Sequence, residues 1–206
     1  HPVYGPNTYA NVGDEIETDG LAKPNMAQTA SLVYDAFNSD NKYSEEIKKI
    51  MRSRWLWGFT GILYTLKLVY VQNNPETRNG MPFMDESELV KKLEQNNPNV
   101  RTLQYGFKRG SMSSLELAKN LFVIALAGEE GADKLGQVAD TFKIRPYLYS
   151  FESVNEPLTR VSALDSGRDF DLRLGVGGVR GEGRYGCAFG VRNSNTGEAS
   201  RAQNLE

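Results

Sequence analysis

The chain has 206 residues, a formal net charge of −2 at pH 7, and 39% hydrophobic and 24% charged residues. This length allows one large domain with a buried core, and this composition excludes a wholly disordered chain. The nearly neutral balance excludes a basic field over the whole protein, of the kind that attracts nucleic acid.

Catalytic and metal-binding side chains are scarce in this sequence. His1 is the only histidine and Cys187 the only cysteine, so neither a Ser-His-Asp or Cys-His catalytic site nor a zinc cluster is expected from one chain. The sequence contains no P-loop motif for phosphates. We therefore predict no catalytic residue, no metal site and no cofactor, and we expect a protein that is not an enzyme.

The first part of the chain is rich in residues that interrupt regular structure. Residues 1–28 contain three of the eight prolines and show no helical periodicity. Proline, glycine and asparagine in such numbers are typical of turns and irregular chain. Residues 1–28 are therefore predicted to form an extended N-terminal arm. Residues 29–38 follow with apolar side chains at helical spacing and predict a short amphipathic helix.

Residues 45–71 hold the longest apolar run and both tryptophans, Trp55 and Trp57. On a helix, nearly every side of the second half of this segment is apolar, which is typical of a helix in the centre of a core or of a membrane span. The uninterrupted run, residues 55–66, is shorter than the roughly 20 residues that a span requires. We therefore predict a central core helix and no contact with a membrane.

Further helices are predicted by their start and stop signals. Asp85 with Glu88, and Ser113 with Glu116, have the spacing of capping boxes at helix starts. Gly128 is placed to end the second of these helices. The predicted segments are a helix that begins at Asp85 and ends before Pro98, a helix over residues 115–127, and a helix over residues 132–142.

The amino-acid composition changes after Pro157, where glycine and arginine become frequent. Residues 169–174 alternate polar and apolar side chains, which predicts a strand, and residues 185–191 could pair with it. The predicted fold class is mainly α. A helical-bundle core of about five helices at residues 29–151 follows the extended arm, and residues 152–206 form a Gly/Arg-rich C-terminal region with minor β or irregular structure.

Two motifs in the C-terminal region have both a functional and a structural interpretation. A dinucleotide-binding pattern, GxGxxG, is formed by Gly181, Gly183 and Gly186. This pattern works at the N-terminus of a helix, and the residues that follow it here are poor helix formers. An acidic cluster is formed by Asp165, Asp169 and Asp171. Such carboxylates can hold a divalent cation, but the arginines between them favour ion pairs instead.

Basic and aromatic residues near glycine-containing turns indicate contact with single-stranded nucleic acid. Arginine and lysine pair with phosphates, aromatic rings stack on bases, and glycine lets the backbone approach the ligand. Glycine-rich turns with solvated arginines have the same composition and are the alternative. The predicted RNA-binding residues are Arg101, Tyr105, Lys108, Arg109, Arg160, Arg168, Arg180 and Arg184.

The layout of an arm on a compact core indicates self-assembly, because ordering a long arm loses entropy unless the arm orders on a neighbouring subunit. In layout alone, the chain is similar to coat and nucleocapsid proteins of helical RNA viruses. The leading hypothesis is a homo-oligomeric structural protein, linked through its arms into a filament or helical capsid, that packages single-stranded RNA by contacts with the RNA backbone. Its expected location is cytoplasmic, and the virion if this hypothesis holds.

Two alternatives stay open at this point. The first is a soluble helical adaptor or regulatory domain that binds a protein partner. The second is an enzyme that uses carboxylates such as Asp165 and Asp169 with a divalent metal.

Overall fold

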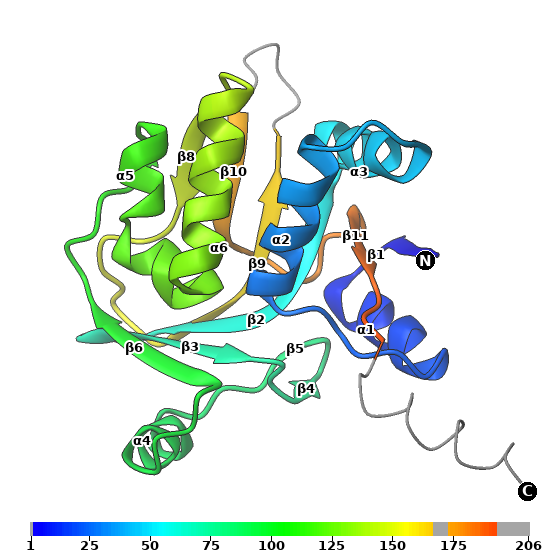
Figure 1. Ribbon diagram of the computed structural model, residues 1–206. Coiled ribbons are helices and arrows are strands. Elements are labelled where there is room, and N and C mark those ends of the chain that lie inside the picture. The colour runs from blue at the N-terminus through cyan, green and yellow to red at the C-terminus, as the bar shows by residue number, and fades with distance from the viewer. Residues whose placement is uncertain (1, 167–172, 193–206) are drawn as a thin grey trace, which may run out of the picture.

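The computed structural model describes residues 2–166 and 173–192 of the chain. Within these residues nine strands form one mixed sheet in the order β1-β11-β2-β9-β10-β8-β7, and β3 and β6 extend the sheet beside the second half of β2 (Figure 1). The strands of this sheet are β1 (Val3–Asn7), β2 (Trp55–Tyr64), β3 (Leu68–Asn73), β6 (Val100–Gln104), β7 (Gly110–Ser111), β8 (Arg145–Tyr149), β9 (Leu158–Asp165), β10 (Arg173–Val179) and β11 (Gly186–Phe189). A separate short hairpin consists of β4 (Thr77–Arg78) and β5 (Met81–Pro82).

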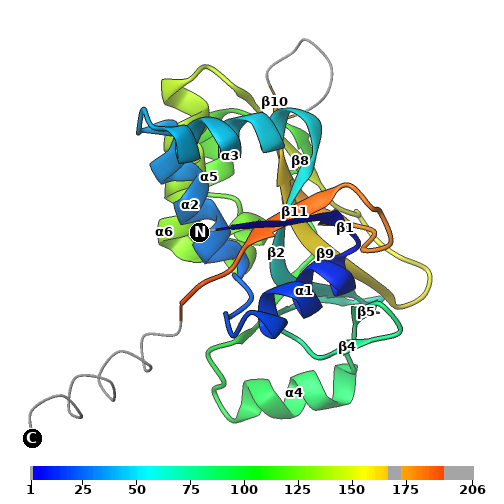
Figure 2. The same cartoon turned by 90° about the vertical axis from the view of Figure 1, so that its right-hand side faces the viewer.

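The larger helices gather on one side of the sheet. Figure 2 shows α2, α3, α5 and α6 together on that side, whereas α1 lies beside β1 and β11, and α4 beside β6. The helices are α1 (Tyr9–Thr18), α2 (Met26–Phe37), α3 (Lys42–Ser53), α4 (Glu86–Glu94), α5 (Ser114–Ala118) and α6 (Leu121–Thr141). The domain is therefore a mixed α/β structure, and the prediction of a mainly α helical bundle is wrong.

The strand β2 occupies the middle of the sheet, where a central helix was predicted. Every residue of β2 except Trp55 is buried. Leu56 and Ile62 pack into the core under the helices. Trp57 and Phe59 pack on the opposite side, against α1. A strand that is covered on both faces carries no polar side, so its run of apolar residues looks like that of a buried helix. The helix prediction is wrong for this reason, and only the preceding α3 is helical.

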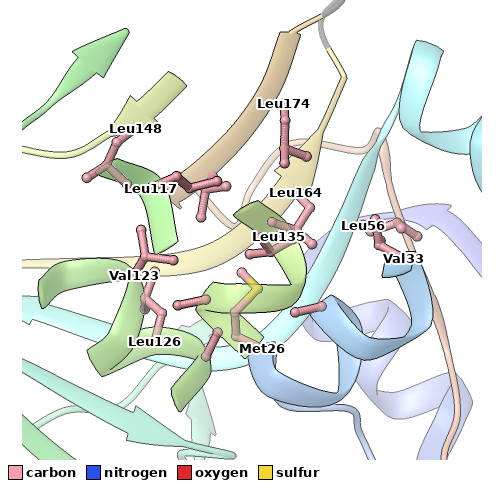
Figure 3. Close-up of a cluster of buried hydrophobic side chains, with 14 of the residues drawn as sticks. Met26, Val33, Leu56, Leu117, Val123, Leu126, Leu135, Leu148, Leu164 and Leu174 are labelled. Atoms are coloured by element: carbon pink, nitrogen blue, oxygen red, sulfur yellow. The ribbon is translucent and has the colours of Figure 1, made fainter. Parts of the chain in front are cut away.

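The main core lies between the sheet and the helices α2, α5 and α6 (Figure 3). The side chains labelled in Figure 3 are Met26, Val33, Leu56, Leu117, Val123, Leu126, Leu135, Leu148, Leu164 and Leu174. Each of them is at most 1% exposed. Burying an apolar side chain of this size contributes about 1.5–3 kcal/mol, so this layer fixes the helices against one face of the sheet.

The first 28 residues are folded into the domain and do not form an extended arm. β1 pairs with β11 in antiparallel orientation, at one edge of the sheet. Tyr9, Val12 and Ile16 recur at helical spacing on α1 and are fully buried. They cover Trp57 and Phe59 of β2 in a second apolar cluster. The predicted arm is wrong because these three side chains supply enough apolar surface to dock the segment.

The capping signals at two helix starts are confirmed, but the helix predicted over residues 115–127 is divided between α5, which ends at Ala118, and α6, which begins at Leu121. The helix predicted at residues 29–38 is α2, which begins three residues earlier. Ser113 and Glu116 form the capping box that opens α5. The Asp85 side chain caps α4. Gly128 has φ +73° and interrupts α6, at the position where a helix end was predicted.

The described part of the C-terminal region contributes three strands to the sheet, β9, β10 and β11. β10 begins at Arg173, so the strand predicted over residues 169–174 lies mostly outside the described residues. β11 is a strand, as expected, and among the described residues it pairs with β1 and β2. Across residues 2–166 and 173–192, no helix combines the length and the apolar character that a bilayer span requires.

Candidate ligand-binding site

The strands β8 and β10 carry two kinds of side chain on their two faces. Leu148 and Leu174 pack into the main core under the helices. Tyr147, Tyr149 and Arg173 alternate with these leucines, so they project from the opposite face of the sheet. All three are partly exposed. We call Tyr147, Tyr149 and Arg173 the tyrosine–arginine face.

Two glycines of β10 make room for this face. The parallel register of β8 and β10 places Gly175 beside Tyr147 and Gly177 beside Tyr149. A Cβ atom on Gly175 would lie 2.8 Å from Cε2 of Tyr149 and would collide with the carboxylate of Asp165. Gly177 has φ +138° and leaves no space between its Cα and the Tyr149 backbone. The Tyr149 ring therefore lies against the bare backbone of Gly175.

The arginine and the two tyrosines of the face contact one another. The Arg173 guanidinium carbon lies 5.0 Å from the ring centroid of Tyr147 and 5.3 Å from that of Tyr149, within the range of cation–π attraction. The two ring centroids are 4.8 Å apart. Nε of Arg173 is buried and has no hydrogen-bond partner among the described residues.

The protonation state of Tyr149 depends on its burial and on the charged groups beside it. Burial raises the pKa of Tyr149, the Asp165 carboxylate raises it further, and Arg173 acts in the opposite direction. The Tyr149 phenol is therefore neutral at physiological pH and can donate a hydrogen bond. The face thus combines a fixed cation, a hydroxyl donor and two aromatic rings.

A hollow of about 450 Å³ adjoins the face at the edge of the sheet. The hollow is lined by Arg109, Gly110, Tyr147, Leu148, Tyr149, Ser150, Phe151 and Gly178. At its rim Arg109 forms an ion pair of 3.0 Å with Glu152, which is largely exposed. This volume admits a side chain or a small group of a larger ligand.

A second, larger hollow of about 770 Å³ lies between α2, α3 and the end of β11. Polar side chains such as Asn25, Asp35 and Asn41 line it together with apolar ones such as Leu32 and Phe189. No arginine or lysine lines it. It therefore offers neither the cation nor the paired rings that converge at β8 and β10.

The structure gives three of the predicted RNA-binding residues an internal partner. Nη1 of Arg101 donates to the Ala125 carbonyl oxygen at 3.0 Å. The Tyr105 hydroxyl donates to the Thr65 carbonyl oxygen at 2.6 Å. Nζ of Lys108 contacts Glu116 at 2.7 Å. Each of these side chains thus contributes to the fold where it lies.

The other predicted RNA-binding residues are placed as follows. Arg109 lines the hollow, and Arg160 lies beside it over the Phe151 ring. Arg180 follows directly after β10, close enough to Arg160 for their charges to interact. Arg184 is exposed in the turn before β11, and Arg168 lies outside the described residues. The structure therefore brings Arg160 and Arg180 together next to the hollow that Arg109 lines.

Sequence reasoning missed the tyrosine–arginine face. Neither Tyr147 nor Tyr149 was among the predicted site residues, and Arg173 received no role. The signal that could have found the face is the alternation of residues 145–149, in which every second side chain belongs to the core. A strand period there predicts two tyrosines on the face away from Leu148.

The structure shows where the described residues of the two C-terminal motifs lie. Gly183 packs under Trp55, and Gly186 packs so closely under Trp57 that a Cβ atom there would collide with the indole ring. Gly183 precedes β11 and Gly186 is its first residue, so the GxGxxG pattern leads into a strand and not a helix. In the acidic cluster only Asp165 is described, since residues 169 and 171 lie outside the described residues. Within the described part of the chain no group of three His, Cys, Asp or Glu side chains could hold a metal ion.

The structure is similar to a solved protein of Nanoarchaeota that is described as accommodating massive sequence variation by the C-type lectin fold. The two proteins share 18% sequence identity and superimpose with a TM-score of 0.63, over 93% of this chain and 97% of that chain. The chain has the C-type lectin fold. No protein-family model matches the sequence, and no curated protein sequence matches it.

The C-type lectin fold overturns the hypothesis of a coat protein. That hypothesis required a helical bundle with free arms that link subunits into a filament or capsid, whereas the described chain is a mixed α/β domain whose N-terminal segment is docked. The assignment to capsids and virions is therefore wrong, and the adaptor alternative is wrong in its helical fold. The expectation that copies of the chain associate with one another, and with RNA, stays a prediction.

Proposed function

We propose that this chain is a recognition domain that binds a protein partner through the tyrosine–arginine face and does not catalyse a reaction. One observation carries the proposal. Tyr147, Tyr149 and Arg173 stand together, partly exposed, on a floor of glycine backbone and on the side of the sheet away from the main core.

The chemistry of the face supports a protein ligand. Tyrosine and arginine are enriched among the residues that dominate binding energy at protein interfaces. Tyrosine offers a large rigid surface with a polar end and loses little entropy on binding. Because both tyrosines stand on a strand of the sheet, their positions are fixed before a ligand arrives, and this lowers the ordering cost of binding.

The fold supports a role in which the amino acids of the tyrosine–arginine face vary in sequence while the buried core residues are retained. The similar solved protein is described as accommodating massive sequence variation by the C-type lectin fold. In this chain Tyr147 and Arg173 belong to none of the buried clusters, so their replacement leaves the core complete. The face is thus separable from the residues that hold the domain together.

The proposal is tested by site-specific photo-cross-linking. The residue Tyr147 is replaced by a benzophenone-bearing phenylalanine, and the purified protein is irradiated in an extract of the cells that produce it. We expect a defined protein to be cross-linked, and we expect the product to be reduced at least tenfold when Arg173→Ala is added. The control carries the same photoreactive residue in place of Leu66, which is 64% exposed in the turn between β2 and β3.

Two results would contradict the proposal. The first is the absence of a product at position 147. The second is an identical set of products at positions 147 and 66, because this would report general stickiness and not a binding face. The thermal melting of each variant is recorded beside the cross-linking, so that loss of the fold is recognised as such.

A further inference from the structure

Arg160 stands at the side of the hollow, on β9, in an environment that is unusual for a cation. Its guanidinium carbon lies 5.5 Å from the centroid of the Phe151 ring, and its Nη1 donates to the Thr159 carbonyl oxygen at 2.8 Å. The side chain is half-buried, yet it forms no ion pair with a carboxylate among the described residues. A cation that is partly removed from water is unfavourable unless an anion compensates it.

A second arginine makes the need for an anion greater. Val179 of β10 pairs with Val161 of β9, so the neighbouring Arg180 comes to lie across from Arg160. Burial lowers the pKa of Arg160 and the charge of Arg180 lowers it further, while Tyr64 and Glu182 act in the opposite direction. Arg180 is exposed and likewise forms no ion pair with a carboxylate of the described residues. Like charges at facing positions repel each other, and these two arginines lie where the pairing of β9 with β10 ends.

Hydroxyl groups complete the surroundings of the two arginines. The Tyr64 and Ser150 hydroxyl oxygens lie 3.0 Å apart, and Ser150 lines the hollow. Gly178 separates them from the arginine, because a Cβ atom at this position would lie 3.1 Å from the Tyr64 oxygen and 3.2 Å from Cβ of Arg160. The lining of the hollow thus includes Ser150 of the hydroxyl pair and Gly178, the neighbour of Arg160.

We infer that Arg160 and Arg180, with the Ser150 hydroxyl, bind an oxyanion that the ligand of the hollow carries. Arginine suits this role because its planar group of N–H donors matches a carboxylate or a phosphate. The inference rests on the proposed function, since it names the group that the protein partner presents: the carboxylate of an acidic side chain or the phosphate of a phosphorylated one. The oxyanion neutralises the two facing charges. By strand alternation Arg160 lies on the same face of β9 as Leu158 and Leu164, so the oxyanion site is next to the hollow but is not part of the tyrosine–arginine face.

The test is an NMR titration of the protein labelled with ¹⁵N, following the Nε–Hε signals of its arginines. Inorganic phosphate and acetate are added in separate series, with chloride adjusted to keep the ionic strength constant. We expect saturable shifts of the Arg160 and Arg180 signals with at least one of the two anions. Tighter binding of phosphate indicates a phosphorylated side chain, and tighter binding of acetate indicates an acidic one.

Variants separate this site from general attraction of anions. Arg160→Gln is expected to weaken anion binding about tenfold or more, which is the usual effect of losing a hydrogen bond to a charged group. Arg180→Gln is also expected to weaken anion binding. Because Arg180 is exposed, this replacement leaves the fold intact. The control is Arg52→Gln, an exposed arginine of α3 that also lacks an ion pair within the described part of the chain.

The inference is overturned if the shifts rise linearly without saturation, or if Arg160→Gln and Arg180→Gln bind both anions as tightly as Arg52→Gln does. Because the titration requires no protein partner, its result is independent of the cross-linking experiment. Saturable anion binding without a cross-linked partner leaves the oxyanion site standing and removes protein recognition. A cross-linked partner without anion binding removes the oxyanion site alone.

Discussion

Glu116 uses its two carboxylate oxygens for two different purposes. One oxygen accepts a hydrogen bond from Nζ of Lys108 at 2.7 Å, and the other accepts one from the backbone N–H of Ser113 at 2.8 Å. Lys108 is the largest cause, followed by Ser113, of a shift that lowers the Glu116 pKa to about 2. The same residue thus starts α5 and anchors the loop before it.

This depressed pKa predicts a pH dependence for Glu116→Gln. Because the pKa is lower in the folded chain than the ordinary value of about 4.3, ionised Glu116 stabilises the fold above that value, and the contribution is lost as the pH falls toward 2. We expect the variant to melt at a lower temperature than the unmodified protein at pH 7, and the two to converge near pH 2. Thermal melts at both pH values check this. A difference that is equal at the two pH values would contradict it, and Glu94→Gln, at an exposed position on α4, is the control.

At this scale the sequence predicts capping contacts but not long-range partners. Ser113 and Glu116 are three positions apart, so their pairing follows from helix geometry alone. Lys108 lies eight positions before Glu116, in a loop whose path no periodicity defines, and it was predicted to bind phosphate instead. Tyr147 and Arg173 meet only because β8 and β10 are neighbours in the sheet. No local pattern contains that information.

The helix α6 illustrates how one element depends on another. Gly128 breaks the helical backbone, and the carbonyl oxygen of Ala125 is bound by Arg101 from β6. The last carbonyl groups before a helix break have no partner within the helix. Arg101 therefore acts as a C-terminal cap that is supplied by a strand.

We expect Arg101→Gln to lower the free energy of unfolding by about 1–2 kcal/mol, which is the usual effect of losing one hydrogen bond from a charged donor to a buried acceptor. Urea denaturation followed by circular dichroism measures the change. The matched control is Arg145→Gln, an exposed arginine of β8, for which we expect less than about 0.5 kcal/mol. Equal stabilities of the two variants would show that the Ala125 carbonyl needs no cap.

The elements differ in how far the sequence alone defines them. Helix ends at Asp85 and Ser113 were placed correctly because capping is a local interaction. The strand β2 was predicted as a helix, because only the layers on its two faces decide the conformation of a run with no polar side. One of these layers is α1, about 40 residues earlier, and the other includes α6, about 60 residues later.

At the scale of the whole molecule, the N-terminal segment is a structural component. We expect Tyr9→Ala with Ile16→Ala to lower the free energy of unfolding by about 5 kcal/mol or more, since each replacement leaves a cavity in the cluster around Trp57. A loss of this size is comparable with the total stability of a typical domain. The double variant is therefore expected to melt far below the unmodified protein.

Thermal melts of the double variant are compared with those of Asp14→Ala with Thr18→Ala, which changes two exposed positions of the same helix. The control pair is expected to stay close to the unmodified protein. If both pairs melt alike, α1 does not support the sheet, and the segment behaves as the loose arm that the sequence predicted.

The overall topology could not be predicted from one sequence. The first and last strands of the sheet, β1 and β11, are neighbours although almost the whole domain lies between them in the chain. Pairing over such a separation leaves no periodic signal, and the glycines of the C-terminal region look the same in a loose tail and in a packed strand. Their role became visible only with Trp55 and Trp57 placed over Gly183 and Gly186.

The antiparallel pairing of β1 with β11 also has a practical consequence. Val3 lies opposite Phe189, so the described chain enters and leaves the domain at one place, while β8 and the hollow lie toward the other edge with β2, β9 and β10 in between. A linker or carrier attached next to β1 or β11 would lie at the edge of the sheet opposite the hollow and would leave the hollow accessible. The domain is therefore suited to display on a bead, a phage or a cell surface, and to grafting into a loop of a host scaffold.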